Sequence, residues 1–212
     1  MNGNDKQLLN SNGRPCMAPD EIEDLLFWLV ADAEAAYCDP GDPVSRWHDQ
    51  SGSNNHFNAG SAADFWAGQI NGHDAIRFAW ANLRDYHSDI NPTSLTCLVV
   101  SQTAGSLHNA HTWEALIAGE GNGGSRWTIR PAQNASGYPV PYGPDIRRVR
   151  YNDMRGVGEI MIGGSPWTNQ AWLDNHLIAE IVFYPRALND EEYARVTNYL
   201  KAYYEIDAVV TQ

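Results

Sequence analysis

The stretch LIAEIVFYPRALNDEE, residues 177–192, decides how the rest of the chain is interpreted. Its first half is almost continuously apolar, which is typical of a central strand buried on both faces. Pro185 ends that strand, and Asn189 with Glu192 three residues later forms the capping box of a helix. Apolar residues then recur at helical spacing, at Val196, Tyr199, Leu200 and Tyr203. The sequence therefore predicts a central strand, a turn and one C-terminal helix that packs on the sheet.

Upstream of this stretch, short apolar runs alternate with clusters of Gly, Pro, Asn and Asp, which is the pattern of an all-β sandwich. Residues 25–30 fit a buried strand or a helix, because periodicity cannot separate the two in so short a run. The other candidate strands are residues 75–80, 95–102, 113–118, 126–130, 147–151, 159–162 and 177–184. We expect a core that contains Trp28, Phe78, Val99, Ile181 and Phe183.

Composition and charge argue against several classes of function. The 212 residues include 14 Lys and Arg against 26 Asp and Glu, a formal net charge of −12, which disfavours a protein that neutralises nucleic-acid phosphates. No run reaches the roughly 20 apolar residues of a membrane span, and residues 1–5 lack the pattern of a signal peptide. Three cysteines without C-x-x-C spacing predict neither a disulfide scaffold nor a Cys-rich zinc site. We therefore expect neither nucleic acid nor a membrane among the partners.

Several motifs occur in a fixed order along the chain. They are LFWLVAD (26–32), VSRWHDQSG (44–52), DAIRF (74–78), IAEIVFYPRALNDEE (178–192) and YLKAYY (199–204). Together they resemble the concanavalin A-like lectin/glucanase superfamily, in its laminin-G-like jelly-roll branch. The resemblance makes residues 25–30 a strand and implies an all-β fold, a two-sheet antiparallel jelly-roll sandwich with a concave face open to ligands. We accordingly divide the chain into an extended N-terminal polar arm (1–18), the jelly-roll domain with its C-terminal helix (19–206) and a tail (207–212).

Glucanases of this superfamily carry their carboxylates at every second position of one strand, because this spacing directs them to one substrate face. The predicted strands lack that spacing: Met161 stands two residues after Glu159, and Val182 two residues after Glu180. We therefore predict that the protein is not an enzyme, leaving open carboxylates that separate loops bring together. Glu180, inside the most apolar strand, is interpreted as a structural acid whose partner is a basic residue such as Arg186.

Aromatic and basic residues in the third quarter of the chain are the candidate contacts for a glycan or a partner protein. Tyr138 and Tyr142 lie on a Pro-rich loop near Trp127, and rigid rings at a surface suit both sugar rings and protein interfaces. Arg148 and Arg150 point to the same side of a strand, toward solvent, an anionic glycan or an acidic neighbour. Local packing of the rings and a solvated basic face are the alternatives.

Asp49 and Asn54 lie in a turn rich in oxygen ligands, and they are the candidate ligands of a Ca²⁺ ion. The same residue types also suit a turn in which Asn and Asp side chains bond their own backbone. Apart from Ca²⁺, we expect no cofactor.

The polar arm points to an assembly. Its Asn, Gly and Ser cannot form a core, so we expect it to lie along another subunit, anchored by Leu8 and Leu9. We therefore predict a non-enzymatic structural or adhesion module: a bacteriophage virion protein, a capsid decoration or tail-associated subunit. Its partners would be copies of itself or capsid and tail proteins. The alternative is a lectin module of a cell-surface or exported protein that binds glycans, and a glycoside hydrolase ranks third. The expected location is the virion, or the outside of the cell.

Overall fold

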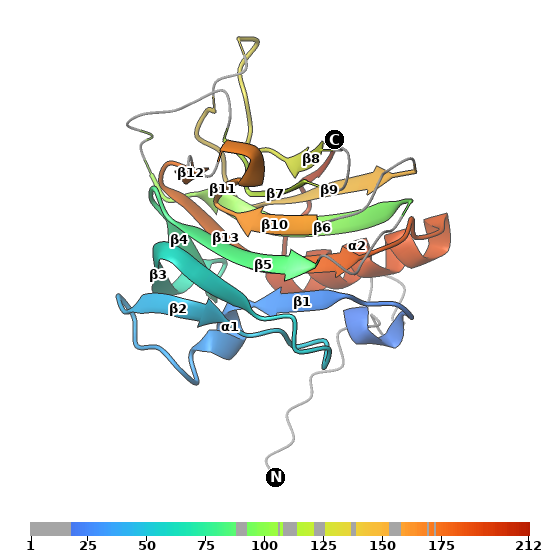
Figure 1. The fold of residues 1–212 in the computed structure, drawn as a ribbon, viewed down its shortest axis with the longest axis horizontal. Coiled ribbons are helices and arrows are strands. Elements are labelled where there is room, and N and C mark those ends of the chain that lie inside the picture. The colour runs from blue at the N-terminus through green and yellow to red at the C-terminus, as the bar shows by residue number, and fades with distance from the viewer. Residues whose placement is uncertain are drawn as a thin grey trace.

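Short strands succeed one another along the chain, and one long helix follows near the end (Figure 1). The computed structural model describes residues 18–212 apart from 88–92, 106, 108–113, 121–125, 137–138, 153–157, 169 and 172. Leu8, Leu9 and Tyr138 lie outside the described residues, so the predictions for the arm and for that tyrosine stay predictions.

The strand predicted over residues 25–30 is confirmed as β1, and most of the elements that follow are also strands. In chain order these are η1 (Pro19–Glu21), β1 (Phe27–Val30), α1 (Ala31–Glu34), β2 (Pro43–Trp47), β3 (Phe57–Ile70), β4 (His73–Phe78), β5 (Asn82–His87), β6 (Leu95–Thr103), β7 (Ile117–Glu120), β8 (Arg126–Ile129), β9 (Asp145–Tyr151), β10 (Gly158–Ile162), β11 (Gly164–Ser165), η3 (Pro166–Thr168), β12 (Gln170–Ala171), β13 (His176–Tyr184), α2 (Asp190–Tyr204) and β14 (Val209–Thr211).

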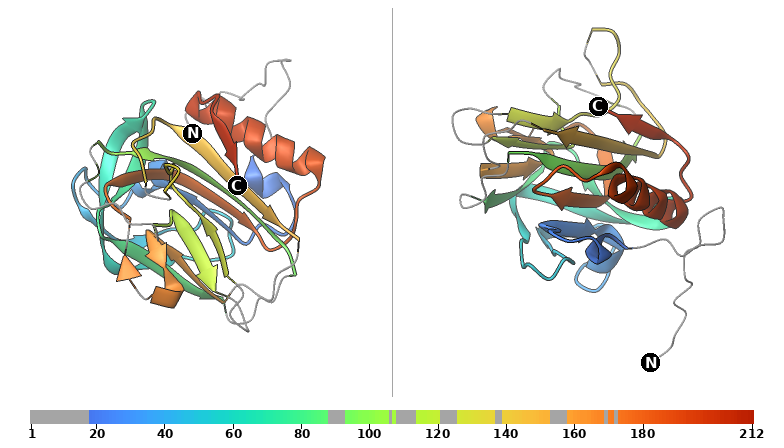
Figure 2. Two further views of the ribbon diagram at one scale, coloured as in Figure 1. Left: turned by 90° about the horizontal axis from the view of Figure 1, so that it is seen from above. Right: turned by 90° about the vertical axis from the view of Figure 1, so that its right-hand side faces the viewer.

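Hydrogen bonds join most of these strands into one curled sheet. Its path is β14-β9-β6-β13-β4-β3-β5-β10-β7-β8, with β1 added on β13 and β2 on β3. The long strand β3 bends the sheet, because its second half pairs with β4 and its first half with β5, with a register shift in each ladder. The sheet thereby folds over itself into two layers, which the view from above separates (Figure 2). The predicted all-β sandwich is confirmed, and its two expected sheets are continuous through β3.

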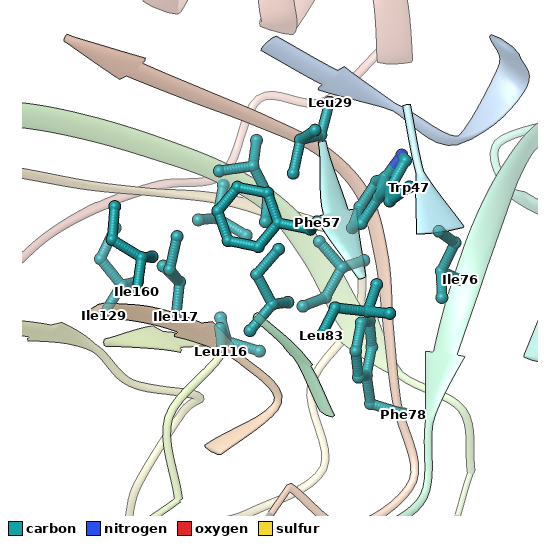
Figure 3. Close-up of a cluster of buried hydrophobic side chains, with 14 of the residues drawn as sticks. Leu29, Trp47, Phe57, Ile76, Phe78, Leu83, Leu116, Ile117, Ile129 and Ile160 are labelled. Carbon is teal, nitrogen blue, oxygen red and sulfur yellow. The ribbon is translucent and has the colours of Figure 1, made fainter. Parts of the chain in front are cut away.

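Apolar side chains fill the space between the front layer, β5-β10-β7-β8, and the back layer, β4-β13-β6-β9 (Figure 3). The predicted core residues Phe78, Val99, Ile181 and Phe183 are fully buried there, and each such side chain contributes roughly 1.5–3 kcal/mol. The prediction for Trp28 is corrected. Its side chain is only partly buried and packs in a second cluster beneath α2, because it lies on the opposite face of β1 from Phe27.

The helix α2 covers the outer face of the back layer (Figure 2). Its capping box is confirmed: Asn189 Oδ1 accepts from the Glu192 backbone N–H at 2.9 Å, and Glu192 Oε2 accepts from that of Asn189 at 3.0 Å. Beyond the helix, residues 209–211, part of the predicted tail, form β14 parallel to β9. Since α2 occupies the outer face of the back layer, the outer face of the front layer is the one that no described α-helix covers. None of the described helices has the length and apolar character needed to cross a membrane.

Candidate functional site

Two glutamates face each other on neighbouring strands of the front layer. Glu159 of β10 and Glu120 of β7 are direct cross-strand partners in an antiparallel ladder. Directly opposed residues place their Cβ atoms about 4.5–5.5 Å apart on the same face of a sheet. The side chains of Glu159 and Glu120 are 22% and 29% exposed. A ligand that lies on this face therefore reaches both carboxylates.

Alternation along the strands directs both glutamates away from the core. Ile160, which follows Glu159, lies in the core between the layers. Gly119, which precedes Glu120, is the cross-strand partner of the buried Trp127. A Cβ on Gly119 would overlap the indole ring, so only glycine leaves room for it. Because successive side chains of a strand point to opposite faces, Glu120 and Glu159 point outward.

Each glutamate is paired with an arginine. Arg84 Nη1 lies 3.3 Å from Glu159 Oε1, and Arg126 Nε lies 3.1 Å from Glu120 Oε1. The two positive charges offset the repulsion between two carboxylates on one face. The Arg126 side chain remains 53% exposed, so its other N–H groups are available to ligand oxygens.

A close approach of β3 and β5 orients Arg84. Its Nε donates to Asn82 Oδ1 at 3.0 Å, and the Asn82 backbone N–H donates to Ser61 Oγ at 3.0 Å. A Cβ on Gly60 would overlap the Asn82 side chain. Glycine at this position thus allows the asparagine to hold Arg84 beside Glu159.

A cavity of about 230 Å³ opens beside the glutamate pair, at the edge strand β8. It is lined by Arg126, Trp127, Thr128, Arg130, Tyr151 and Trp167. The guanidinium carbon of Arg126 lies 5.1 Å from the centre of the Trp167 ring, a cation–π contact that ties η3 to β8. Arg126 therefore belongs both to the glutamate pair and to the cavity.

Trp127 and Tyr142, two of the predicted binding aromatics, have different surroundings. The expected surface position of Trp127 is corrected: the ring is 1% exposed and packs 5.4 Å from that of Phe183, because it fills the space that Gly119 leaves free. Tyr142 is partly buried, and its hydroxyl lies 3.0 Å from Ser101 Oγ. Burial raises the pKa of the Tyr142 phenol above its usual range. Contact of these rings with a glycan or a partner stays a prediction.

Arg148 and Arg150 dock on the helix of their own chain. The Nη1 atom of Arg148 donates to Thr197 Oγ1 at 3.0 Å, and that of Arg150 donates to Asp190 Oδ1 at 2.8 Å. Both guanidinium groups also lie over the Tyr193 ring, at 4.5 and 5.3 Å from its centre. The expected common direction of the two side chains is explained by these contacts with α2, and their binding of an external anion stays a prediction.

Glu180 is buried between the back layer and α2. Its Oε1 accepts from Trp28 Nε1 at 2.6 Å and its Oε2 from the Tyr204 hydroxyl at 2.9 Å. Burial raises the pKa of Glu180 to about 8, the largest cause being loss of hydration. The expected partner is corrected, because Arg186 pairs with Glu192 at 2.8 Å. Glu180 is a structural acid, held by two hydrogen-bond donors instead of a cation.

The Asp49 carboxylate stabilises its own turn through hydrogen bonds to the backbone. Its carboxylate accepts from the backbone N–H groups of Trp28 and Ser51 at 2.9 Å and of Asn55 at 3.0 Å. Asn54 has the left-handed φ of 60° that such turns use. Within the described part of the chain, no three His, Cys, Asp or Glu residues are grouped to hold a metal ion. Calcium at Asp49 and Asn54 stays a prediction.

The glutamate pair escapes a search along single strands, because it forms across two of them. Each member follows a glycine, in Gly119-Glu120 and Gly158-Glu159. These repeated dipeptides are the local signal that could have drawn attention to the pair. The register that brings them together is set by the whole ladder and cannot be inferred from either segment alone.

The fold is similar to solved structures of carbohydrate-active enzymes, although neither a family model nor a curated protein matches the sequence. A mutant GH54 α-L-arabinofuranosidase soaked with 4-nitrophenyl α-L-arabinofuranoside matches with a TM-score of 0.53 and 11% identity, over 84% of this chain and 59% of that chain. A GH54 α-L-arabinofuranosidase soaked with a cyclic sulfate inhibitor matches with 0.50 and 14%, over the same shares.

Domain 4 of AbnA, a GH43 extracellular arabinanase from Geobacillus stearothermophilus, in complex with arabinotriose, matches with a TM-score of 0.50 and 12% identity. The match covers 82% of this chain and 98% of that domain. The chain spans about three fifths of the arabinofuranosidase chains, 59% in each case. At these identities the likeness shows the fold.

Two predictions about function are wrong. The virion role is overturned because the similar solved structures are glycoside hydrolases and a domain of one. The prediction that the protein is not an enzyme is overturned by the same structures. The carboxylate spacing on which it rested was sought along single strands, whereas Glu120 and Glu159 are paired across two strands. The subunit partners and the location stay predictions.

Proposed function

We propose that the chain is the β-sandwich domain of a glycan-cleaving enzyme in which Glu120 and Glu159 react with the glycosidic bond. The observation that carries this proposal is their direct pairing on the outer face of the front layer, where both side chains remain partly exposed. Retaining glycosidases hold their two carboxyl groups about 5–5.5 Å apart. Opposed residues of a ladder have Cβ atoms about 4.5–5.5 Å apart, so the side chains of Glu120 and Glu159 can reach one glycosidic bond.

The chemistry needs both carboxyl groups in different protonation states. One carboxylate attacks the anomeric carbon, the glycosidic C–O bond breaks, and the other group, as the acid, gives its proton to the leaving oxygen. The resulting ester joins the sugar to the first glutamate. The second group, now a carboxylate, removes a proton from water, which attacks the anomeric carbon and releases the glutamate.

The neighbouring residues suit the positioning of a saccharide on this face. Exposed N–H groups of Arg126 can bond sugar hydroxyls, and Arg84 holds Glu159 in place through its own bond to Asn82. Such fixed donors lose little entropy when the ligand binds.

Similarity to known structures supports the substrate class. The motifs that resemble the concanavalin A-like lectin/glucanase superfamily suit a sandwich with a ligand on one sheet face. Two of the similar structures were studied with an α-L-arabinofuranoside and with arabinotriose. Arabinose-containing glycans are therefore the first substrates to test.

The test measures release of 4-nitrophenol from 4-nitrophenyl α-L-arabinofuranoside and of arabinose from arabinotriose. We expect turnover by the unaltered protein and a loss of about 10²–10⁴-fold in Glu120→Gln and Glu159→Gln. The matched control is Glu191→Gln, on α2, whose side chain is 73% exposed and pairs with Arg195; it should keep full activity.

Azide assigns the two roles. In Glu120→Ala and Glu159→Ala, azide should restore turnover, giving an inverted glycosyl azide where the nucleophile is missing and a retained one where the acid is missing. Absence of turnover on both substrates and on a panel of other aryl glycosides, with folded protein, would contradict cleavage. Activity unchanged in both glutamine variants would contradict the assignment of the pair.

A further inference from the structure

Two arginines line the cavity beside Glu120, and the other described arginines close to them in sequence have partners elsewhere. Arg147 pairs with Asp145 at 2.5 Å, while Arg148 and Arg150 are occupied by α2. Arg126 and Arg130 are left facing the cavity at the edge of β8. Because Arg126 is already paired with Glu120, Arg130 is the cationic side chain of this cavity that can attract a negative ligand in a chain of net charge −12.

Hydrogen bonds fix the backbone of Arg130. Its backbone N–H donates to Gln212 Oε1 at 2.9 Å, and its carbonyl accepts from Gln212 Nε2 at 2.7 Å and from Arg147 Nη1 at 3.1 Å. Among the described residues, none pairs with or hydrogen-bonds its guanidinium group. The guanidinium group of Arg130, with its five N–H donors, is thus attached to a backbone held by hydrogen bonds. A guanidinium group can bind a carboxylate through two parallel hydrogen bonds.

The other walls of the cavity suit a ring. Tyr151 and Trp167 contribute aromatic surface, and Thr128 contributes a hydroxyl group. Drug-sized ligands occupy pockets of about 300–1,000 Å³, so a volume of about 230 Å³ fits a single sugar ring. Aromatic surface on one side and a few polar groups on the other match the apolar face and the hydroxyl edge of a pyranose.

We propose that this cavity is a subsite for an acidic sugar, a pyranose that carries a carboxylate, as in a uronic acid. Arg130 binds the carboxylate. Arg126 joins the subsite to Glu120, since its Nε bonds that glutamate while its guanidinium lies over Trp167. The inference rests on the proposed function in one respect: the bound ring is placed next to the bond that the glutamate pair cleaves.

The experiment compares two probes that differ only at C6, methyl β-D-glucuronide and methyl β-D-glucoside, by NMR titration of the full chain. We use Glu159→Gln as the host, because this variant leaves Arg126 with its partner and prevents turnover. We expect the glucuronide to bind about tenfold or more tightly than the glucoside, since a charge-assisted hydrogen bond is lost without the carboxylate. In Arg130→Gln that advantage should disappear.

The control variant is Arg195→Gln, on the exposed side of α2, which should keep the tenfold preference. Equal binding of the two glycosides, or a preference that survives Arg130→Gln, would overturn the inference. Sodium sulfate that binds as tightly as the glucuronide would show an anion site without a sugar subsite and would also overturn it. The preference is measured without catalysis, so failure of the proposed cleavage would leave this result standing, and the reverse is equally true.

Discussion

Replacing Glu180 by Gln should remove most of the pH dependence of stability that this buried acid imposes. Burial raises the pKa of Glu180 to about 8 in the folded protein, from an ordinary value of 4.5. Below pH 4.5 both states bind the proton; between pH 4.5 and 8 only the folded state does. The free energy of unfolding therefore falls by about 1.4 kcal/mol per pH unit across this window, and by about 5 kcal/mol in total. Above pH 8 the contribution is constant.

Gln at position 180 has no proton to lose over this range. Its carbonyl oxygen can accept from Trp28 Nε1, and its amide can donate to the Tyr204 hydroxyl oxygen, in place of the bonds that the acid makes. Relative to the unaltered protein, we expect the free energy of unfolding of the variant to increase by about 1.4 kcal/mol for each pH unit from 5 to 8. Urea unfolding at pH 5, 6, 7, 8 and 9 measures this difference.

The difference isolates Glu180 because the groups around it are unchanged in the variant. Asp32 from α1, Tyr184 from β13 and Tyr199 from α2 are present in both proteins. Glu191→Gln on the exposed face of α2 is the control and should follow the unaltered protein in parallel. A constant difference in the free energy of unfolding between Glu180→Gln and the unaltered protein from pH 5 to 8 would contradict the raised pKa of Glu180. If the variant does not fold, a ¹³C NMR titration of the Glu180 carboxyl group decides, and ionisation below pH 6 would be the refuting result.

Two further changes test the packing that positions the site. Gly119→Ala should lower the free energy of unfolding by about 1–3 kcal/mol, because its Cβ overlaps the buried Trp127 ring. Gly143→Ala, which has open space around it, is the control, and equal denaturation midpoints for the two variants would contradict the packing. Asn189→Ala should cost about 1 kcal/mol through loss of the α2 cap; a midpoint unchanged from that of the unaltered protein would show that the cap contributes nothing.

The local signals of the chain predict its end better than its middle. Strand β13 and helix α2 follow from an apolar run, Pro185 and the capping box of Asn189, all within one short segment. The direction of Arg148 and Arg150 also follows from alternation. Alternation does not predict that α2 covers these arginines. The helix is distant in sequence: Arg150 and its partner Asp190 are 40 residues apart.

The site depends on pairings that no segment encodes by itself. From its own segment, Trp127 is predicted to lie at the surface. Its burial depends on Gly119, which lies opposite it in the ladder. Glu120 and Glu159 are separated by two intervening strands in sequence, and they meet only because β7 and β10 are neighbours in the front layer. Likewise, Glu180 is satisfied by Trp28, 152 residues away in sequence. Long-range register is the physical information that periodicity and capping rules lack.

Covalent trapping identifies the residue that attacks the anomeric carbon. The protein is incubated with an activated 2-deoxy-2-fluoro arabinofuranoside, in which the fluorine slows hydrolysis of the glycosyl-enzyme ester, and is then digested for mass spectrometry. We expect one added fluorosugar on the peptide that contains Glu120 or on the peptide that contains Glu159, and no label in the double variant Glu120→Gln/Glu159→Gln. A label on any other residue, or a label that persists in the double variant, would contradict the assignment of the pair.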